Sequence, residues 1–448
     1  MEPIEQGSVC MILPVARDGH VSILARWYVL LVMCLVYSLS IADRYVMSTV
    51  LEPIRLEFHL SDSGIAFLTG VSLALFYVSF GFPMSWIADR TSRRNVIVAS
   101  LISWSVMTAC FGMARTYWQL LSARVGVGIG EAGGTPSASS IISDYFPAER
   151  RPMAMTVFSL GAPIGAWLGG NVAAAIADRY GWRSVFLALG LPGILAGVAV
   201  LATVKEPRRG RFDVSSDGPA PTFAQTMRFL LQQRSCIHLM AATGLTTLWG
   251  WGLMWWTPAF LMRSYSLTVG EAGAITGPIH LLGGAVATIF TGWLLGRPSM
   301  SDPRKIVWLL GLVIGVSTVL SGLIYATHSL VVAKTLFWIF IPSIYFYIGP
   351  TFGLFNNLAA PGMRAIYCAT TLFIQNFGNL VIAPQVVGLL SDRFATYHVR
   401  SADSLRLALL CLVPTGFWAT AHYFFSARDL VADEQRARMH ALYPGVTR

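Results

Sequence analysis

The sequence predicts an all-α polytopic membrane protein in which twelve transmembrane helices form two pseudo-symmetric bundles of six. Of its 448 residues, 55% are hydrophobic and 12% are charged, and the mean hydropathy is +0.60. Soluble domains carry about 25% charged residues, so this composition is typical of a chain that crosses a membrane many times. Twelve apolar runs are each long enough to cross a hydrocarbon core of about 30 Å. They lie near residues 27–50, 63–87, 95–114, 117–145, 153–176, 183–204, 236–262, 270–296, 305–326, 330–358, 365–390 and 404–427.

The distribution of basic residues predicts the orientation of these helices. The first apolar run starts at Trp27, has full spanning length and lacks the cleavage site of a signal peptide, so we expect it to remain as the first helix. With the N-terminus inside, 21 Lys and Arg residues lie on the cytoplasmic side and 8 outside, while Arg44, Arg124 and Lys334 lie within spans. Both termini are therefore predicted to be cytoplasmic, in a protein of the cell membrane. The net charge of +10 follows from this topology and does not indicate nucleic-acid binding.

The connection of residues 205–234 divides the chain into two halves. It is basic and rich in Pro, Gly and Ser, and then amphipathic from Phe223 to Leu231, as expected of a helix along the inner interface. The expected units are a tail (1–26), a first bundle (27–204), this linker (205–234), a second bundle (235–428) and a second tail (429–448).

The two halves resemble each other in sequence. Gly70 and Arg90 recur 207 residues later as Gly277 and Arg297. At an offset of 214 residues, the residues Pro136, Pro147, Arg150, Asp178 and Arg179 recur as Pro350, Pro361, Arg364, Asp392 and Arg393. A repeat of six helices in one orientation indicates a duplicated transporter fold, with the substrate site between the halves.

Charged residues interrupt two of the apolar runs in the first half. Asp43 and Arg44 lie in the first run, and Arg124 and Glu131 lie seven residues apart in the glycine-rich segment RVGVGIGEAGG. An ionisable group at membrane depth is costly, so it faces a cavity or a partner. Asp43 and Arg124 have similar depths and opposite charges, so we expect an ion pair, with Arg44 turned about 100° away toward a ligand. The alternative is that all four charges only hold the helices together.

Other sequence patterns argue against an enzyme active site and against a metal site. Gly128, Gly130 and Gly133 spell GxGxxG, but they lie mid-span with no strand before them, so a dinucleotide site is rejected. There is no Walker loop, the six cysteines have no ligand spacing, and His238 and His280 stand alone in sequence. We expect no enzyme activity, no metal and no cofactor, with protons as the coupling ion.

Three motifs resemble a known family. ADRTSRR, which ends at Arg94, is similar to the loop signature GxxxDRxGRR of the major facilitator superfamily, with Ser85 and Ser92 in place of its glycines. RVGVGIGEAG fits the family's fourth-helix pattern RxxxGxGxxG, and GAPIGAWLGG approaches its antiporter pattern, where Ala162 breaks the Gly-Pro step. The segments YSLSIADRYVMSTVLEPI and GIGEAGGTPSASSIISDYFPAERR together resemble the bacterial spinster-like branch. The resemblance covers the whole chain and is strongest in the first half.

The resemblance implies a central cavity lined by helices one, four, seven and ten. The expected substrate-binding residues are Arg44, Arg124, Glu131, Trp255 and Tyr345. Glu131 and Asp43 are the expected proton-coupling residues, because a carboxyl near mid-membrane can load and release a proton as each side opens. Since the first half is charged and the aromatic second half apolar, an amphiphile with an anionic head would fit.

Charges on neighbouring cytoplasmic loops are expected to form an inner gate. The expected gating residues are Asp89, Arg90, Arg94, Glu149 and Arg150. Arg93 and Arg151 are interpreted only as topology charges.

These observations predict a monomeric, proton-coupled secondary transporter that works by alternating access. The family resemblance implies a sphingolipid or lysophospholipid as substrate, in a protein surrounded by membrane lipids. One alternative is a proton-coupled symporter of small organic anions or phosphate esters. An alternative of another class is a non-transporting lipid receptor, which would have no need of proton-carrying carboxylates.

Overall fold

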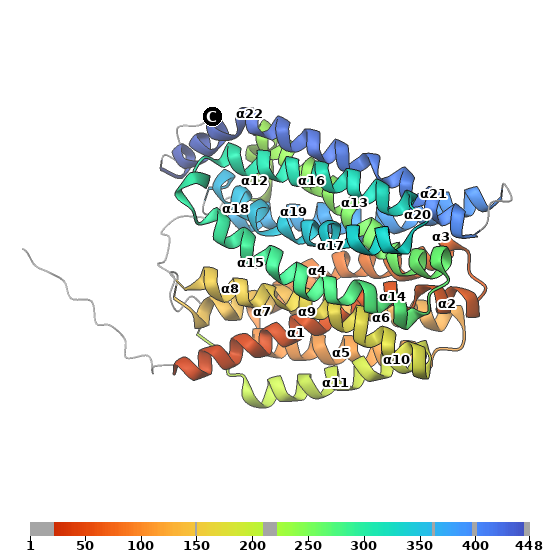
Figure 1. Cartoon of the computed structure of the whole chain (residues 1–448). Helices are drawn as coiled ribbons and strands as arrows, with labels where there is room; N and C mark the ends of the chain where they lie inside the picture. Colours follow the sequence, from red (N-terminus) through yellow and green to blue (C-terminus); the bar gives the residue numbers. More distant parts are fainter. Residues whose placement is uncertain (1–21, 148–149, 209–221, 361–362, 397–400, 443–448) are drawn as a thin grey trace, which may run out of the picture.

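The structure is a computed structural model that describes residues 22–147, 150–208, 222–360, 363–396 and 401–442. The described chain is helical, and Figure 1 shows the first-half helices packed side by side below those of the second half. The first half contains α1 (Ile23–Thr49), α2 (Leu51–Glu57), α3 (Asp62–Ala66), η1 (Phe67–Val71), α4 (Ser72–Arg90), α5 (Arg93–Met113), α6 (Tyr117–Glu131), α7 (Gly134–Tyr145), α8 (Arg151–Ser159), α9 (Gly161–Trp167), η2 (Leu168–Val172), α10 (Ala173–Tyr180) and α11 (Trp182–Thr203).

The second half follows a short amphipathic helix, α12 (Phe223–Leu231), whose predicted bounds are confirmed. The second half contains α13 (Arg234–Tyr265), α14 (Val269–Pro278), η3 (Ile279–Gly283), α15 (Gly284–Leu295), η4 (Pro298–Met300), α16 (Pro303–Ala326), α17 (Leu330–Phe346), α18 (Ile348–Leu358), α19 (Arg364–Asn376), η6 (Phe377–Ile382), α20 (Ala383–Ala395), α21 (Ser401–Leu412) and α22 (Pro414–Leu442). Within the described residues, ten helices are long and apolar enough to cross a membrane. The segment of α6 and α7, together with α13, completes the expected twelve.

Two boundaries differ from the sequence prediction. The fourth span is broken, because α6 ends at Glu131 and α7 begins at Gly134. The last helix does not end near residue 427 but runs to Leu442. Its extension packs against α13, where the Asp433 carboxylate accepts hydrogen bonds from the backbone N–H and the hydroxyl of Ser235 at 3.0 and 2.7 Å.

Spans two, five, eight and eleven each contain one wide π-helical turn. In the described chain these turns are η1, η2, η3 and η6. The same four spans join the two halves, since α3 contacts α20 and α10 contacts α14. The wide turns therefore occur in the helices that form the interface between the halves.

The halves touch closely at one end of the bundle. We call the end that holds the start of α1 and the end of α22 the termini end, and the opposite end, with α2 and α3, the far end (Figure 1). A Cβ added at Gly70 would lie 2.3 Å from the Leu380 carbonyl oxygen, and one at Gly277 would lie 2.3 Å from the Asn171 Cβ. Both contacts join opposite halves, so the repeated glycine at these two matched positions permits the close approach.

We predict that Gly277→Val opens the far end. The added methyl groups would overlap Asn171, and such overpacking costs about 1–3 kcal/mol, or roughly tenfold in an equilibrium. In a variant without native cysteines, Ser391→Cys reports opening, because Ser391 is buried at this interface. A membrane-impermeant maleimide should label this cysteine about tenfold faster when Gly277→Val is present.

Gly292→Val on the same span is the matched control, because nothing lies within 4 Å of a Cβ added there. It should leave labelling unchanged. An unchanged rate in Gly277→Val would show that the glycine contact does not hold the far end closed.

Candidate functional site

Asp43 on α1 and Arg124 on α6 form a buried ion pair. Arg124 Nη1 lies 3.3 Å from Asp43 Oδ2, and the Thr108 hydroxyl donates to Asp43 Oδ1 at 2.6 Å. The two residues are only 3% and 1% exposed. The predicted pair is confirmed, and it links α1, α5 and α6 at one level.

Arg44 and Glu131 form a second ion pair between the same helices. The Arg44 Nη2 and Nε atoms lie 2.7 and 2.8 Å from Glu131 Oε2. Arg44 turns away from Asp43 as expected, but its guanidinium pairs with Glu131, a contact that the sequence did not predict. A step of one residue along α1 turns the side chain by about 100°, and this turn directs Arg44 from the level of Arg124 toward Glu131. The guanidinium also lies 4.7 Å from the centre of the Tyr77 ring.

The glycines around Glu131 serve helix packing. A Cβ at Gly128 would lie 2.6 Å from the Leu73 carbonyl oxygen, and one at Gly130 would lie 2.7 Å from the Trp104 backbone nitrogen. The glycine motif thus lets α6 approach α4 and α5 closely. Glu131 is placed where the helix breaks, at the end of this tightly packed segment.

A cavity of about 230 Å³ lies between the two halves. Its lining residues are Tyr37, Ile41, Arg44, Tyr45, Ser48, Ala162, Thr247, Trp251, Met254, Trp255, Tyr347, Ile348, Phe352, Leu372, Gln375, Asn376, Asn379 and Leu380. Arg44 is the single charged side chain in this set, and it is 16% exposed while its partner Glu131 is fully buried. Arg44 therefore touches the cavity with one edge and Glu131 with the other.

The structure places the five expected substrate-binding residues in two layers. Arg44 and Trp255 line the cavity, but Arg124, Glu131 and Tyr345 lie behind it. Arg124 is held by Asp43, and the Tyr345 hydroxyl hydrogen-bonds His280 Nδ1 at 2.9 Å. The Tyr345 ring packs edge-on against Trp251, a lining residue, with ring centres 5.6 Å apart.

The second half of the cavity is more polar than expected. Gln375 and Asn376 of α19 and Asn379 of η6 line it beside the aromatic residues. The sequence analysis did not predict these amides, because it considered charged residues and, in the second half, only the aromatic residues of helices seven and ten. Three carboxamides within five residues of an apolar span are the signal that could have revealed them.

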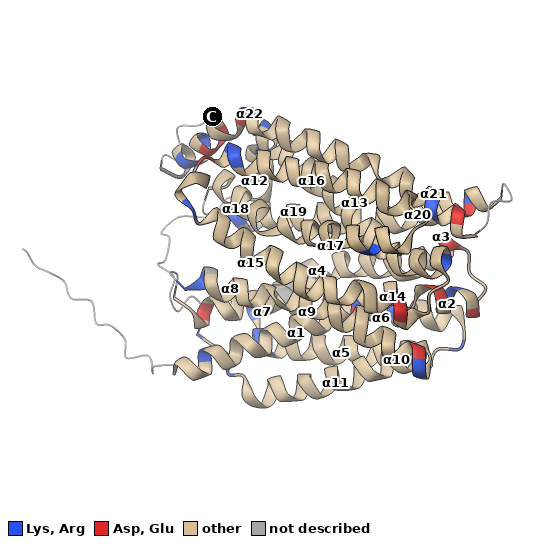
Figure 2. Cartoon of the chain, in the orientation of Figure 1, with Lys and Arg blue, Asp and Glu red and all other residues tan. Residues whose placement is uncertain are grey.

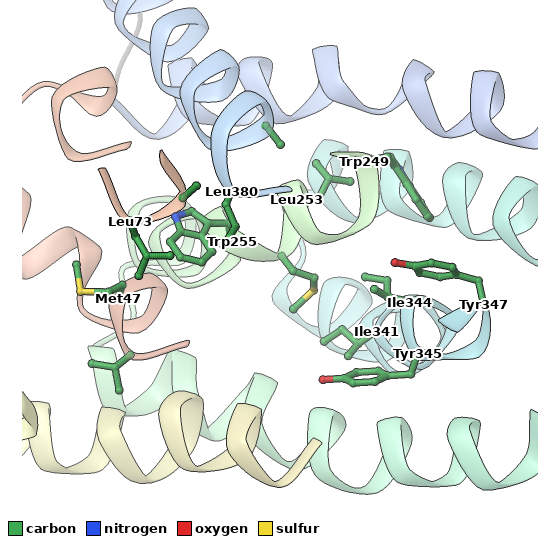
Figure 3. Close-up of a cluster of buried hydrophobic side chains, with 14 of the residues drawn as sticks. Met47, Leu73, Trp249, Leu253, Trp255, Ile341, Ile344, Tyr345, Tyr347 and Leu380 are labelled. Carbon is green, nitrogen blue, oxygen red and sulfur yellow. The ribbon is translucent and has the colours of Figure 1, made fainter. Parts of the chain in front are cut away.

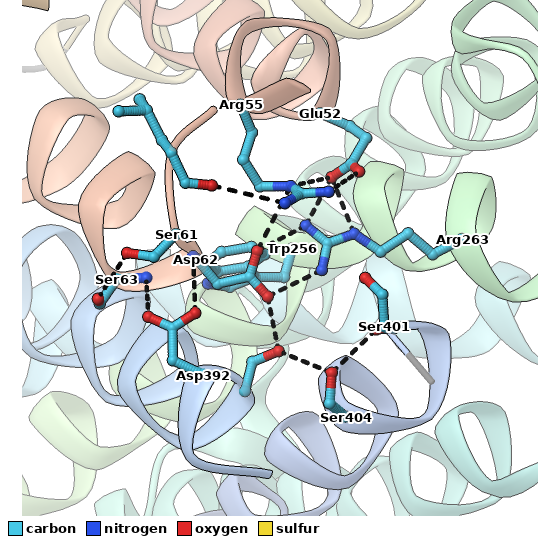
Figure 4. Close-up of polar contacts among 12 residues, drawn as sticks. Glu52, Arg55, Ser61, Asp62, Ser63, Trp256, Arg263, Asp392, Ser401 and Ser404 are labelled. Carbon is cyan, nitrogen blue, oxygen red and sulfur yellow. Dashed lines mark hydrogen bonds and ion pairs between the residues drawn. The ribbon is translucent and has the colours of Figure 1, made fainter. Parts of the chain in front are cut away.

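An ion-pair network that the sequence analysis did not anticipate closes the far end (Figure 4). Arg263 at the end of α13 lies 2.6 Å from Glu52 and 2.7 Å from Asp62, and these two carboxylates belong to the first half. Asp392 of the second half accepts hydrogen bonds from the backbone N–H groups of Asp62 and Ser63 at 2.8 and 2.9 Å. All of these contacts cross between the halves, so they seal the cavity from this end.

Apolar side chains from both halves pack together at the wall of the cavity (Figure 3). Met47, Leu73, Trp255 and Leu380 meet there from both halves, and each is less than 9% exposed. The Ser48 hydroxyl donates to the Trp255 carbonyl oxygen at 2.5 Å and so ties α1 to α13. The far end is thus closed by both polar and apolar contacts.

The expected gate at the termini end is only partly described. The Asp89 side chain and Glu149 lie outside the described residues. Arg90 stacks over Trp86 at 4.0 Å, Arg150 is exposed, and the Arg94 side chain hydrogen-bonds Asn95 and the Val204 carbonyl oxygen. These contacts of Arg90 and Arg94 stay within the first half.

Arg93 and Arg151 are more than topology charges, so that interpretation is wrong. Arg93 is 4% exposed and pairs with Asp144 and Glu206 at 2.5 and 2.9 Å. Although burial raises the pKa of the Glu206 carboxyl, hydrogen bonds from the Arg94 N–H, Arg93 and Ser92 outweigh it and hold that pKa below its ordinary value. Arg151 Nε donates to the carbonyl oxygens of Ser143 and Phe146 at the end of α7. Basic side chains at helix C-termini satisfy the last carbonyls.

Two six-helix halves that enclose a charged cavity, sealed at one end, define a membrane transporter. A family model described as Major Facilitator Superfamily matches residues 33–384. The chain belongs to this superfamily, and its relatives place it in the spinster-like branch. It is therefore an integral membrane transporter and not an enzyme.

Several known proteins are similar over most of their length. An MFS-type efflux pump of Mycolicibacterium smegmatis is 30% identical over 86% of this chain and 89% of its own. The sphingosine-1-phosphate transporter SPNS2 of Danio rerio is 27% identical over 88% and 84%. A bacterial homologue of the human lysosomal transporter Spinster, solved in an inward-facing and unoccupied conformation, has a TM-score of 0.81 at 29% identity and covers 92% of this chain and 99% of that chain.

We predict that Arg124→Met destabilises the protein because it leaves Asp43 charged and unpaired in an apolar environment. Removing one partner of a buried ion pair costs about 3–5 kcal/mol. The purified variant should show a clearly lower melting temperature. The double variant Asp43→Leu with Arg124→Met should recover most of the loss, since no charge remains unpaired. If the two single effects simply add in the double variant, the pair makes no coupled contribution to stability.

Proposed function

We propose that this transporter is proton-coupled and carries an anionic amphiphile, of sphingolipid or lysophospholipid type, by alternating access. The observation that carries the proposal is the contact of Arg44 with both the cavity and the buried Glu131 carboxylate. The guanidinium fork suits carboxylate and phosphate groups. Trp251, Trp255 and Phe352 supply the apolar wall that an amphiphile needs.

In the proposed mechanism, Glu131 and the substrate compete for Arg44. While Glu131 is ionised, it neutralises Arg44 and weakens the attraction for an anion. A proton on Glu131 removes that competition, so Arg44 can bind the anionic head. The proton and the anion are then bound in the same state, which couples their movement across the membrane.

The closed far end supports an inward-facing assignment for this conformation. By the positive-inside rule the termini end is cytoplasmic, so the cavity would load or release substrate on that side. The far-end network around Arg263 must break when the other side opens. We propose that Arg90, Arg94 and Arg150, with Asp89 and Glu149, form the matching gate at the termini end, and that the protein works as a monomer in the cell membrane.

A second candidate substrate class is the small hydroxylated organic acids. The probable L-galactonate transporter of Escherichia coli is 26% identical over 88% of this chain and 87% of its own. The amides of the cavity wall would suit hydroxyl groups, and the cavity volume would suit a small acid.

Flux into proteoliposomes under an imposed pH gradient tests the proposal. Lysophosphatidic acid, sphingosine-1-phosphate, L-galactonate and glycerol phosphate should be compared with protein-free vesicles. We expect gradient-driven accumulation of at least one lysolipid. Accumulation of the small acids alone would favour the second candidate, and flux that ignores the pH gradient would exclude proton coupling.

Glu131→Gln should uncouple transport from the proton gradient, because the amide mimics the protonated form permanently. The variant should still bind and exchange substrate across the membrane. It should lose concentrative uptake under a pH gradient, by tenfold or more in the accumulation ratio. Counterflow and gradient-driven uptake in the same vesicles measure the two activities separately.

Glu57→Gln is the control, since Glu57 is 44% exposed and pairs with Arg183 within the first half. It should leave both activities intact. If Glu131→Gln remains fully driven by the gradient, Asp43 becomes the better proton carrier and the Glu131 assignment is wrong.

A further inference from the structure

Three carboxamide side chains form one polar row on the eleventh span. Gln375, Asn376 and Asn379 have spacings of one, three and four residues, and all three line the cavity that Arg44 enters. No hydrogen bond to another described residue is made by any of the three side chains. All three residues are partly exposed, and only the Asn379 Oδ1 atom is both buried and without a partner in the described structure, which costs free energy. The row therefore has unused hydrogen-bonding capacity directed at the ligand space.

Two buried polar atoms beside this space lack partners in the described structure. Asn379 Oδ1 is an acceptor, and Nε1 of Trp255 is a donor. Trp255 is only 8% exposed and lines the same cavity. A hydroxyl group donates one hydrogen bond and accepts others, so it can satisfy both kinds of atom.

The amides and Arg44 lie on opposite halves of the protein. Arg44 belongs to α1 in the first half, and the amides belong to α19 and η6 in the second. A ligand shifts a conformational equilibrium only through contacts that differ between the two states. An anion held by Arg44 alone would touch one half. A hydroxyl on the same molecule would add the contact with the other half.

We propose that Gln375, Asn376 and Asn379 form a hydroxyl-binding subsite, so that the substrate is an anion with a hydroxyl group close to its acidic group. This inference rests on the proposed transport of an anion through the Arg44 cavity. The same chemistry occurs in a lysophospholipid head and in a sugar acid. It does not occur in a plain fatty acid or in an alkyl phosphate without a hydroxyl.

The size of the cavity agrees with a site that binds the polar part of the substrate. The cavity volume of about 230 Å³ is below the roughly 300–1,000 Å³ of typical ligand pockets. This space fits a polar head or a small acid better than a whole lipid with its acyl chain. The chain of a lipid substrate would extend out of the described cavity.

Two matched pairs of probes test the inference in proteoliposomes. The first pair is 1-oleoyl lysophosphatidic acid and its analogue without the sn-2 hydroxyl, and the second is L-galactonate and hexanoate. We expect the wild-type protein to carry the hydroxylated member of one pair with a KM about tenfold lower than that of its partner. The pair that responds identifies the source, lipid or sugar acid.

Asn379→Leu should raise the KM for the hydroxylated probe about five- to tenfold, and the KM for the deoxy partner less than twofold. Gln375→Leu, on the same row, provides a second variant if Asn379→Leu folds poorly, as judged by melting temperature. Asn357→Leu is the matched control, because Asn357 is exposed and bonds Glu434 outside the cavity. It should change neither KM.

Three outcomes distinguish failure of the hydroxyl subsite from failure of the proposed anion transport. Equal KM values for hydroxylated and deoxy probes in the wild-type protein would overturn the hydroxyl subsite but leave anion transport intact. An equal rise for both probes in Asn379→Leu and Gln375→Leu would also overturn it, since the amides would then act only in packing. If the wild-type protein carries none of the four compounds, the hydroxyl subsite fails, and the proposed function fails as well if sphingosine-1-phosphate is also not carried.

Discussion

A charge that is buried in an apolar environment must be paired. The site depends on two such pairs, both formed between α1 and α6. The Asp43–Arg124 pair, fixed further by Thr108, sets the register of α1 against α6. Because Arg44 is the next residue on α1, this register places its guanidinium against Glu131. In the proposed mechanism, the Arg44–Glu131 pair would exchange partners at the cavity while the Asp43–Arg124 pair keeps the helices aligned. Both pairs rely on the glycines that let α6 pack closely against α4 and α5.

The far-end network follows the same physical rule, with a different consequence. Arg263 brings one positive charge from the second half to two carboxylates of the first, Glu52 and Asp62. Arg55 also lies 2.7 Å from Glu52 and 3.6 Å from Asp62, and because it belongs to the same half it would remain beside them if the halves separated. The carboxylates would then keep one counter-charge while water replaces the other. A gate built this way can hold closed firmly and still open without leaving an isolated charge in an apolar environment.

The hydropathy pattern was enough to predict the spans, and matched depth with opposite charge was enough to predict the Asp43–Arg124 pair. The contacts that the sequence did not predict join more distant segments. Arg263 and Glu52 are 211 residues apart, and no local pattern connects them. In sequence, Arg93 resembles any basic residue of a cytoplasmic loop. Only the fold brings Asp144 and Glu206 beside it and so makes it part of a buried ion pair. The helix that extends to Leu442 likewise makes a contact that the sequence did not predict, between Asp433 and Ser235, 198 residues apart.

The position of the amide row connects ligand binding with the parts of the fold that bend. Asn379 and Leu380 lie within η6, the wide turn of the eleventh span, and both line the cavity. Wide turns interrupt the regular hydrogen-bond pattern of a helix, and they occur often at functional sites. A Cβ at Gly70, in the wide turn η1 of the other half, would meet the Leu380 carbonyl oxygen. A ligand group bound to Asn379 would therefore act on the segment through which the eleventh span touches the opposite half, at the level where the closed far end meets the open cavity.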